Sequence, residues 1–198
     1  MIKNIVFDIG NVLADFRWKE YMIEKGLDGP TIKRVMKASI MTPEWDEFDK
    51  GLFDDDTALE KFASYDPELR GVLEHVYRSI KGMIVPFDYA TDWVASLKND
   101  GYKIYYLSNF SRKAYEECEE SLDFMKYADG GVMSFQEHVI KPDPEIYKRL
   151  LVRYDLKAEE CVFFDDTQKN IDVALELGFN AFLFTTREQA DIDIKSLL

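Results

Sequence analysis

Acidic side chains at three positions of the chain could supply a nucleophile and ligands for a hard cation. Asp8 follows an apolar run, and Gly10 permits a tight turn with close approach of the backbone to a ligand. Asp165 and Asp166 follow a second apolar run. An aspartate after a strand is usually only a turn or helix-capping residue. Two adjacent carboxylates beside a buried strand, however, are costly unless a cation or donors satisfy them.

Two further segments carry groups that could hold an anion. Ser108 and Asn109 follow a third apolar run, and Lys141 begins the sequence KPDP. Alone, the first segment resembles a helix start and the second a surface lysine. Together with the carboxylates, they supply a nucleophile, oxygen ligands, a hydroxyl and a cationic side chain. This combination points to chemistry on a phosphorylated molecule.

The same groups predict a magnesium site. Mg²⁺ prefers octahedral coordination by oxygens from a few carboxylates, a substrate phosphate and water. Asp8, the Gly10 carbonyl and Asp166 could provide direct ligands. Asp165 would complete the predicted metal site through a water molecule. Because the 25 basic and 38 acidic side chains give a net charge of −13, Mg²⁺ and Lys141 would also offset the repulsion of a phosphate.

Apolar runs predict the strands that position these groups. They lack the polar alternation of half-exposed sheets and alternate with helical patterns. This order predicts an α/β fold with a doubly wound, Rossmann-like parallel sheet, which binds ligands at the carboxyl ends of its strands. Strands are predicted at residues 2–8, 103–108, 161–165 and 181–185, with a weaker fifth at 131–134, and helices at 87–99, 144–154 and 170–177.

Residues 16–84 interrupt this alternation with amphipathic helical patterns and no convincing strand. They predict an all-helical cap inserted after the first strand, so that residues 1–15 and 85–198 form the catalytic core. Its helices are predicted near residues 18–25, 31–39, 57–65 and 67–80. Five aromatic residues could line a substrate pocket, although core packing explains most of them equally well: Phe16, Trp18, Trp45, Phe48 and Phe53.

Composition excludes several classes of function. The negative charge disfavours binding to nucleic acid or to an anionic membrane surface. No stretch approaches the roughly 18 apolar residues of a membrane-spanning helix, and the N-terminal residues fit a first strand better than a signal peptide. Cys118 and Cys161 fit buried apolar thiols, and His75 and His138 fit structural roles. A cytoplasmic protein with a small-molecule partner is expected, and the sequence indicates no oligomeric state.

The order and spacing of the four polar segments resemble those of the haloacid dehalogenase-like hydrolase superfamily. FDIGNVL resembles its first motif, LSN its second, KPDP its third and FFDDTQKN its fourth, so the resemblance spans the chain. The helical insertion looks like the cap domain of the family. Residues 45–55, WDEFDKGLFDD, are similar to a cap segment of its sugar-phosphate phosphatases, whose best-known member acts on α-glucose 1-phosphate.

The resemblance implies a Mg²⁺-dependent phosphatase that hydrolyses a small phosphorylated metabolite, a sugar phosphate. Asp8 would attack phosphorus and form an aspartyl phosphate, while Lys141 would neutralise charge on it. The other implied roles are phosphoryl-oxygen binding for Ser108 and Asn109, Mg²⁺ binding for Asp165 and Asp166, and support of that loop for Asn170.

One position departs from the family pattern. Most phosphatases of the superfamily carry a second aspartate two residues after the nucleophile as general acid and base, and here that position is Gly10. Asp15 is a candidate for this acid and base role. The alternative is that Asp15 is only a hinge or cap residue at the entrance to the insertion. Two other functions remain open: a metal-independent 2-haloacid dehalogenase, whose carboxylate substrate Asp165 and Asp166 would repel, and a non-catalytic binding protein on the same fold.

Overall fold

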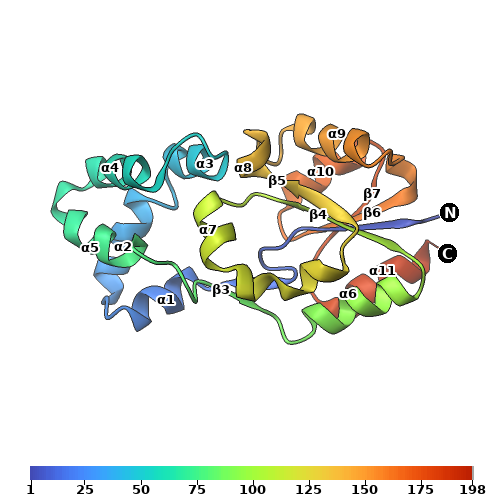
Figure 1. Cartoon of the computed structure of the whole chain (residues 1–198), viewed down its shortest axis with the longest axis horizontal. Helices are drawn as coiled ribbons and strands as arrows, with labels where there is room; N and C mark the ends of the chain where they lie inside the picture. Colours follow the sequence, from blue (N-terminus) through green and yellow to red (C-terminus); the bar gives the residue numbers. More distant parts are fainter. Residues whose placement is uncertain (198) are drawn as a thin grey trace.

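The computed structural model describes residues 1–197, which contain a five-stranded parallel sheet flanked by helices (Figure 1). Its strands lie in the order β5-β4-β1-β6-β7, with β1 in the centre. The chain extends from β1 to one edge and then crosses to the other, so the order of the strands reverses beside β1. The strands are β5 (Gly130–Met133), β4 (Lys103–Ser108), β1 (Asn4–Phe7), β6 (Cys161–Asp165) and β7 (Asn180–Leu183).

Helices cover both faces of the sheet, as the doubly wound prediction requires. Successive side chains of a strand point to opposite faces. In β1, Ile5 and Phe7 therefore pack into one hydrophobic core and Val6 into the other. The first core includes residues of α6 (Ala90–Asn99), η2 (Glu119–Tyr127) and α11 (Arg187–Ser196), and the second includes residues of α9 (Pro144–Arg153) and α10 (Gln168–Glu176). Two short helices complete the core, α7 (Arg112–Glu117) after β4 and η3 (Ala158–Glu160) before β6.

The segment between β1 and α6 forms a separate helical lobe, at the left of Figure 1. A two-stranded antiparallel ribbon of β2 and β3 connects it to the core. These two strands overlap the predicted helical insertion, residues 16–84, only at Phe16 and Ile84. They were missed from the sequence because three-residue strands are too short to show alternation. The elements are β2 (Ala14–Phe16), α1 (Trp18–Glu24), α2 (Gly29–Ala38), α3 (Pro43–Asp49), α4 (Asp55–Tyr65), η1 (Pro67–Leu69), α5 (Arg70–Tyr77) and β3 (Ile84–Pro86).

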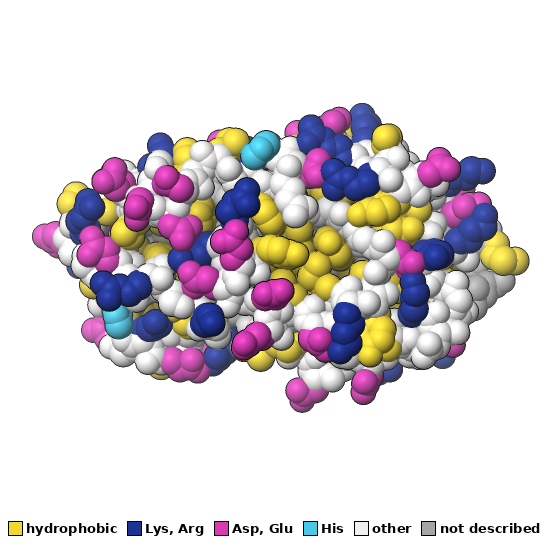
Figure 2. All heavy atoms as spheres, viewed as in Figure 1, with side chains coloured by type: hydrophobic (Ala, Val, Ile, Leu, Met, Phe, Trp, Pro, Cys, Tyr) yellow, Lys and Arg dark blue, Asp and Glu magenta, His cyan; other side chains and the backbone are white. Residues whose placement is uncertain are grey.

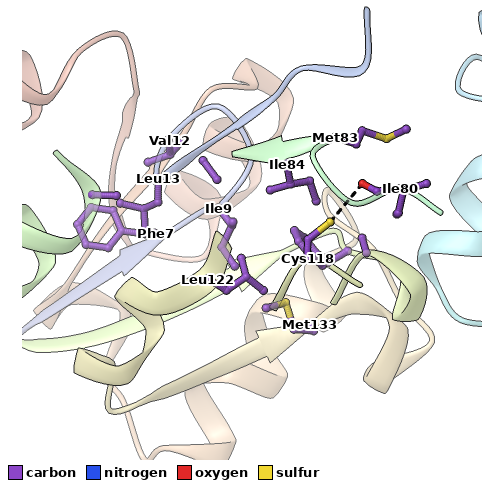
Figure 3. Packing of buried hydrophobic residues seen from close by; sticks show 14 of the residues in the cluster. Phe7, Ile9, Val12, Leu13, Ile80, Met83, Ile84, Cys118, Leu122 and Met133 are labelled. Atoms are coloured by element: carbon purple, nitrogen blue, oxygen red, sulfur yellow. Dashed lines mark hydrogen bonds between the residues drawn. The ribbon is translucent and has the colours of Figure 1, made fainter. Parts of the chain in front are cut away.

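Apolar side chains fill the junction between the lobe and the core (Figure 3). Ile9 and Leu13, which follow β1, pack in one cluster with Ile84 and with Leu122 of η2. Cys118 also lies there, and its Sγ lies 3.5 Å from the carbonyl oxygen of Ile80. Both cysteines are buried and free, as predicted. The junction is therefore a packed hydrophobic joint.

A second connection joins the lobe to the core at the end of α3. The short helix α8 (Ser134–Glu137) follows β5, and its Ser134 Oγ donates to the Asp49 carbonyl at 2.6 Å. His138, just after α8, hydrogen-bonds the Lys50 carbonyl through its ring Nδ1 at 2.8 Å. Gly51 has φ of +68°, and a Cβ there would lie 2.7 Å from the Phe135 carbonyl oxygen. The lobe thus meets the core at the ribbon and at the α3–α8 contact.

Replacing Gly51 by alanine should therefore lower the free energy of unfolding by about 2–5 kcal/mol, the sum of left-handed strain and a steric clash. Gly26→Ala is the matched control, because Gly26 also has positive φ but a Cβ added there would meet no atom within 4 Å. That variant should lose only about 1–2 kcal/mol. Urea unfolding measures both variants. Equal losses of unfolding free energy in Gly51→Ala and Gly26→Ala would contradict the clash, because the α3–α8 contact would then admit a methyl group.

The surface carries both signs of charge. Figure 2 shows acidic and basic side chains interspersed over the visible face of both lobes. Within residues 1–197, no helix has the length and apolarity needed to cross a membrane.

Candidate active site

Asp8 lies at the carboxyl end of the central strand, where its side chain is held by three donors. Its backbone N–H donates to Phe164 of β6 at 2.9 Å and so continues the sheet. Oδ1 accepts hydrogen bonds from the Ile9 N–H at 2.7 Å and the Ser108 hydroxyl at 2.7 Å, and lies 2.9 Å from Lys141 Nζ. Oδ2 accepts none of these bonds. One carboxylate oxygen is thus fixed while the other is left for a ligand.

Lys141 is buried between two carboxylates. Its Nζ lies 2.9 Å from Asp8 Oδ1 and 2.6 Å from Asp165 Oδ2, and 2% of the residue is exposed. Burial lowers the pKa of Lys141, but the two carboxylates outweigh it and raise the pKa above its ordinary value. Asn109 fixes the backbone: its Oδ1 accepts from the Lys141 N–H at 2.8 Å, and its Nδ2 donates to the Lys141 carbonyl at 3.0 Å. The side chain of Asn109 thus positions the lysine.

Asp165 is fully buried at the end of β6, and four donor contacts satisfy its carboxylate. Asn170 Nδ2 lies 2.9 Å from Oδ1 and 3.0 Å from Oδ2, and the Thr167 N–H donates to Oδ1 at 2.8 Å. The fourth contact comes from Lys141 Nζ, at 2.6 Å from Oδ2. Asn170, in the first turn of α10, thus supports the loop that follows β6, as expected from the sequence. Because this carboxylate is already saturated with donors, the structure favours its acting on a metal through water.

Asp166 is held by a residue that sequence reasoning missed. Its Oδ2 accepts from Asn11 Nδ2 at 2.8 Å, and its Oδ1 from the Thr167 hydroxyl at 3.2 Å. Asn11 lies in the turn after Gly10 with φ of +56°, a conformation that asparagine tolerates better than most residues. The Gly-Asn pair at the end of a predicted strand was the available signal for this contact.

The carboxylates fit a magnesium site. Asp8, Asp165 and Asp166 each offer an oxygen, and these oxygens lie within 4.8 Å of one another. Hard oxygen donors without nitrogen or sulfur are the set that Mg²⁺ prefers. The cluster agrees with the predicted Mg²⁺ cofactor.

Burial dominates the electrostatics of Asp8. It raises the pKa of Asp8 to about 7, while Lys141 opposes this and Asp165 adds to it. Lys141 and the donors Ser108 and Ile9 stabilise the charged form, but they do not outweigh the burial. A divalent cation beside this carboxylate would favour the anion, since an opposite charge lowers a carboxyl pKa.

A cavity of about 210 Å³ lies against this cluster, between the core and the helical lobe. Asp8, Gly10 and Asp166 line one side, and Asn109, Ser111 and Lys113 also contribute polar groups. Lys113 is not free, since it pairs with Asp55 of α4 at 2.8 Å and with Glu117. Of the five aromatic residues that were candidates, the lining includes Phe16, Trp45 and Phe48 but not Trp18 or Phe53.

The structure does not bring every candidate to this site. Asp15 is exposed on β2, between Ala14 and Phe16, which both line the cavity. Alternation along a strand directs Asp15 to the other face of the ribbon. His75, whose Nε2 contacts the Lys25 carbonyl at 3.1 Å, and His138 both bond to backbone, which agrees with structural roles.

A parallel sheet with carboxylates, a lysine and a hydroxyl at the carboxyl ends of its strands defines a class of hydrolase. The chain belongs to the haloacid dehalogenase-like hydrolases, whose family model matches residues 2–178. It is similar to a D-ribitol-5-phosphate phosphatase from Bacteroides thetaiotaomicron, 29% identical over 196 residues that cover 92% of this chain and 91% of that protein. A sesquiterpene phosphatase from Aspergillus oryzae is 24% identical over 196 residues, covering 99% of this chain and 96% of the relative.

The fold is also similar to that of a solved haloacid dehalogenase-family enzyme from Bacteroides thetaiotaomicron in complex with magnesium and inorganic phosphate. That comparison has a TM-score of 0.73 and 20% identity, and covers 96% of this chain and 99% of the other. The predicted fold, superfamily and enzyme class are confirmed. The narrower resemblance to phosphatases of α-glucose 1-phosphate stays a prediction.

Proposed function

We propose that this protein is a Mg²⁺-dependent phosphatase that hydrolyses a small phosphorylated metabolite through an aspartyl phosphate on Asp8. One observation carries the proposal: Asp8 has one oxygen fixed by three donors, including Lys141, and lies in a carboxylate cluster at a cavity between the core and the lobe. The phosphatase activity of similar proteins supports it.

Each residue then has a defined task. Asp8 attacks phosphorus, and its bond to the phosphoryl group replaces the bond to the leaving oxygen. Lys141 and the Ser108 hydroxyl lie on Asp8 and would neutralise and bind phosphoryl oxygens, while Asn109 keeps Lys141 in place. Asp8, the Gly10 carbonyl, Asp165 and Asp166 would hold Mg²⁺, which offsets phosphate charge when bound.

Residues 16–84 are the proposed cap domain over a core of residues 1–15 and 85–198. Residues of the lobe, including Trp45, Phe48 and Asp49, form one side of the cavity, so they can contact the part of the substrate that leaves. The core supplies the phosphate-handling groups. This division predicts that substitutions at the aromatic lining residues of the lobe, Trp45 and Phe48, alter substrate preference more than chemistry.

The proposed substrate is a sugar or sugar-alcohol phosphate. The cavity volume of about 210 Å³ lies below the range of about 300–1,000 Å³ typical of drug-sized ligands, which suits a small metabolite. One relative acts on D-ribitol 5-phosphate by its name. The cavity also offers Asn109 and Ser111 to hydroxyl groups.

A phosphate monoester with an apolar organic group is a second candidate. Much of the cavity is lined by apolar side chains, among them Phe16, Trp45, Phe48 and Met83. Burying apolar surface of a ligand against them would contribute about 25 cal/mol per Å². The sesquiterpene phosphatase among the similar proteins supports the same chemistry.

Phosphate release should therefore require Mg²⁺. We expect EDTA to abolish it and added Mg²⁺ to restore it, because nothing else in the site offsets both the carboxylates and the phosphate. The substrates are D-ribitol 5-phosphate, sugar 1- and 6-phosphates and an isoprenyl monophosphate. Activity on D-ribitol 5-phosphate or the sugar phosphates supports the proposed sugar or sugar-alcohol substrate. Activity on the isoprenyl monophosphate supports the substrate with an apolar organic group. Undiminished turnover in EDTA, or halide release from a 2-haloacid, would instead indicate a dehalogenase.

A further inference from the structure

The reaction proposed above lacks a group to protonate the leaving oxygen. Gly10 has no side chain, and Asp15 points away from the cavity. Within residues 1–197, the acidic residues that line the cavity are Asp8, Asp166 and Asp49. The first two belong to the nucleophile and metal cluster. Asp49 is therefore the lining carboxyl group without an assigned task.

Asp49 is held in place although it belongs to the helical lobe. It is the last residue of α3, and its carbonyl accepts from Ser134 Oγ at 2.6 Å. The same Ser134 Oγ accepts from the Phe110 N–H at 2.8 Å, and Phe110 directly follows Asn109. A single hydroxyl thus ties Asp49 to the loop that carries Ser108 and Asn109. The contacts of Lys50 and Gly51 with α8 reinforce this position.

The surroundings of Asp49 favour its neutral form. Burial raises the pKa of Asp49 to about 8, the charge of Asp46 adds to this, and a hydrogen bond from Trp45 opposes it. The cavity therefore holds a carboxylic acid with a proton to donate near neutral pH, as a general acid requires. The cavity lining to which it belongs also carries Asp8, Asp166, Lys113 and, on α5, Tyr77, while Ser134 holds the Asp49 backbone carbonyl.

We propose that Asp49 is the general acid and base of the reaction and takes the task of the aspartate missing at position 10. In the first step, Asp8 bonds to phosphorus, the bond from phosphorus to the leaving oxygen breaks, and that oxygen takes the proton of Asp49. In the second step, water attacks phosphorus, the bond to Asp8 breaks, and the Asp49 carboxylate takes a proton from the water. The acid is regenerated, and the inference rests on the proposed phosphatase function.

The closing experiment measures kcat/KM against the pKa of the leaving group for a series of aryl and alkyl phosphates, under conditions where chemistry limits the rate. With Asp49 intact the plot should be nearly flat, since the leaving group departs protonated. Asp49→Asn should leave 4-nitrophenyl phosphate within about threefold of wild type but slow alkyl and sugar phosphates by roughly 10²–10⁴-fold. Asp49→Glu should restore part of the alkyl activity.

Glu44→Gln is the matched control, since Glu44 lies on the same helix but outside the cavity lining. In this variant, kcat/KM should remain nearly independent of the pKa of the leaving group. The pH profile gives a second readout: because the acid must carry its proton, wild-type activity on alkyl phosphates should fall as pH rises through about 8, and Asp49→Asn should lose this limb.

Restoring a carboxylate elsewhere tests the same idea independently. A Cβ at Gly10 would meet no atom within 4 Å, so Gly10→Asp is sterically possible, and it should raise the alkyl activity of Asp49→Asn. Equal loss on aryl and alkyl esters in Asp49→Asn, or an unchanged plot, would overturn the role of Asp49. If wild type releases phosphate from none of the esters with Mg²⁺, the phosphatase proposal itself fails instead.

Discussion

Asparagine in place of Asp8 is expected to lower phosphate release by at least about a thousandfold, because an amide keeps the shape of the side chain but lacks the attacking anion. The fold should persist. Asp8 is small and lies at the end of β1, and its backbone hydrogen bond to Phe164 does not depend on the side chain. Steady-state phosphate release, together with circular dichroism of the same preparation, measures both effects.

Asp15→Asn is the matched control for this prediction. Asp15 is also an aspartate, but it is exposed on β2, on the outer face of the ribbon. It should retain wild-type turnover. Phosphate release by Asp8→Asn at more than a few per cent of wild type would contradict the assignment of Asp8 as nucleophile, and a severe loss in Asp15→Asn would contradict its placement outside the site.

Methionine in place of Lys141 is expected to damage both stability and activity. The substitution leaves Asp8 and Asp165 buried without their shared cation, and removing one partner of a buried ion pair typically costs about 3–5 kcal/mol. Turnover should fall by at least about a hundredfold, since phosphoryl oxygens lose a charged donor. Urea unfolding without Mg²⁺ and phosphate release with Mg²⁺ measure the two losses separately.

The loss of stability should depend on pH with a defined sign. The pKa of Asp8 is raised to about 7 even with Lys141 present, and removing the lysine raises it further. A carboxyl group whose pKa is raised by folding destabilises the fold increasingly as pH rises from its unfolded pKa to its folded pKa. The loss in free energy of unfolding of Lys141→Met relative to wild type should therefore grow above pH 7 and shrink below it. Lys3→Met, which breaks an exposed pair with Glu160, should show no such change.

The sequence predicted those parts of the fold that rest on local composition. The strands of the sheet are continuous apolar runs, and the motifs at their ends follow from them. The ribbon of β2 and β3 was missed because ADF and IVP are three residues each and the second contains a proline. Helix α3 was missed because PEWDEFD is short and strongly acidic.

Two site residues depended on contacts that local patterns do not encode. Asn11 reaches Asp166 across 155 residues of sequence, and only after a left-handed turn. Asp49 joins the cavity because α3 docks on Ser134, a contact across 85 residues. The sequence therefore located the carboxylates, the lysine and the hydroxyl of the core, while the part of the cavity formed by the lobe required the tertiary structure.

The ribbon also bears on how such enzymes diversify. Ala14 pairs with Pro86, so the two ends of the inserted segment lie one strand apart, a spacing of about 5 Å. A segment with adjacent ends can be lengthened, shortened or exchanged in a single genetic event without moving the strands that carry Asp8 and Asp165. Evolution can thus change what the protein selects without altering the nucleophile or the carboxylate cluster of the core. The α3–α8 contact sets the condition on that freedom, because a replacement segment must recreate it.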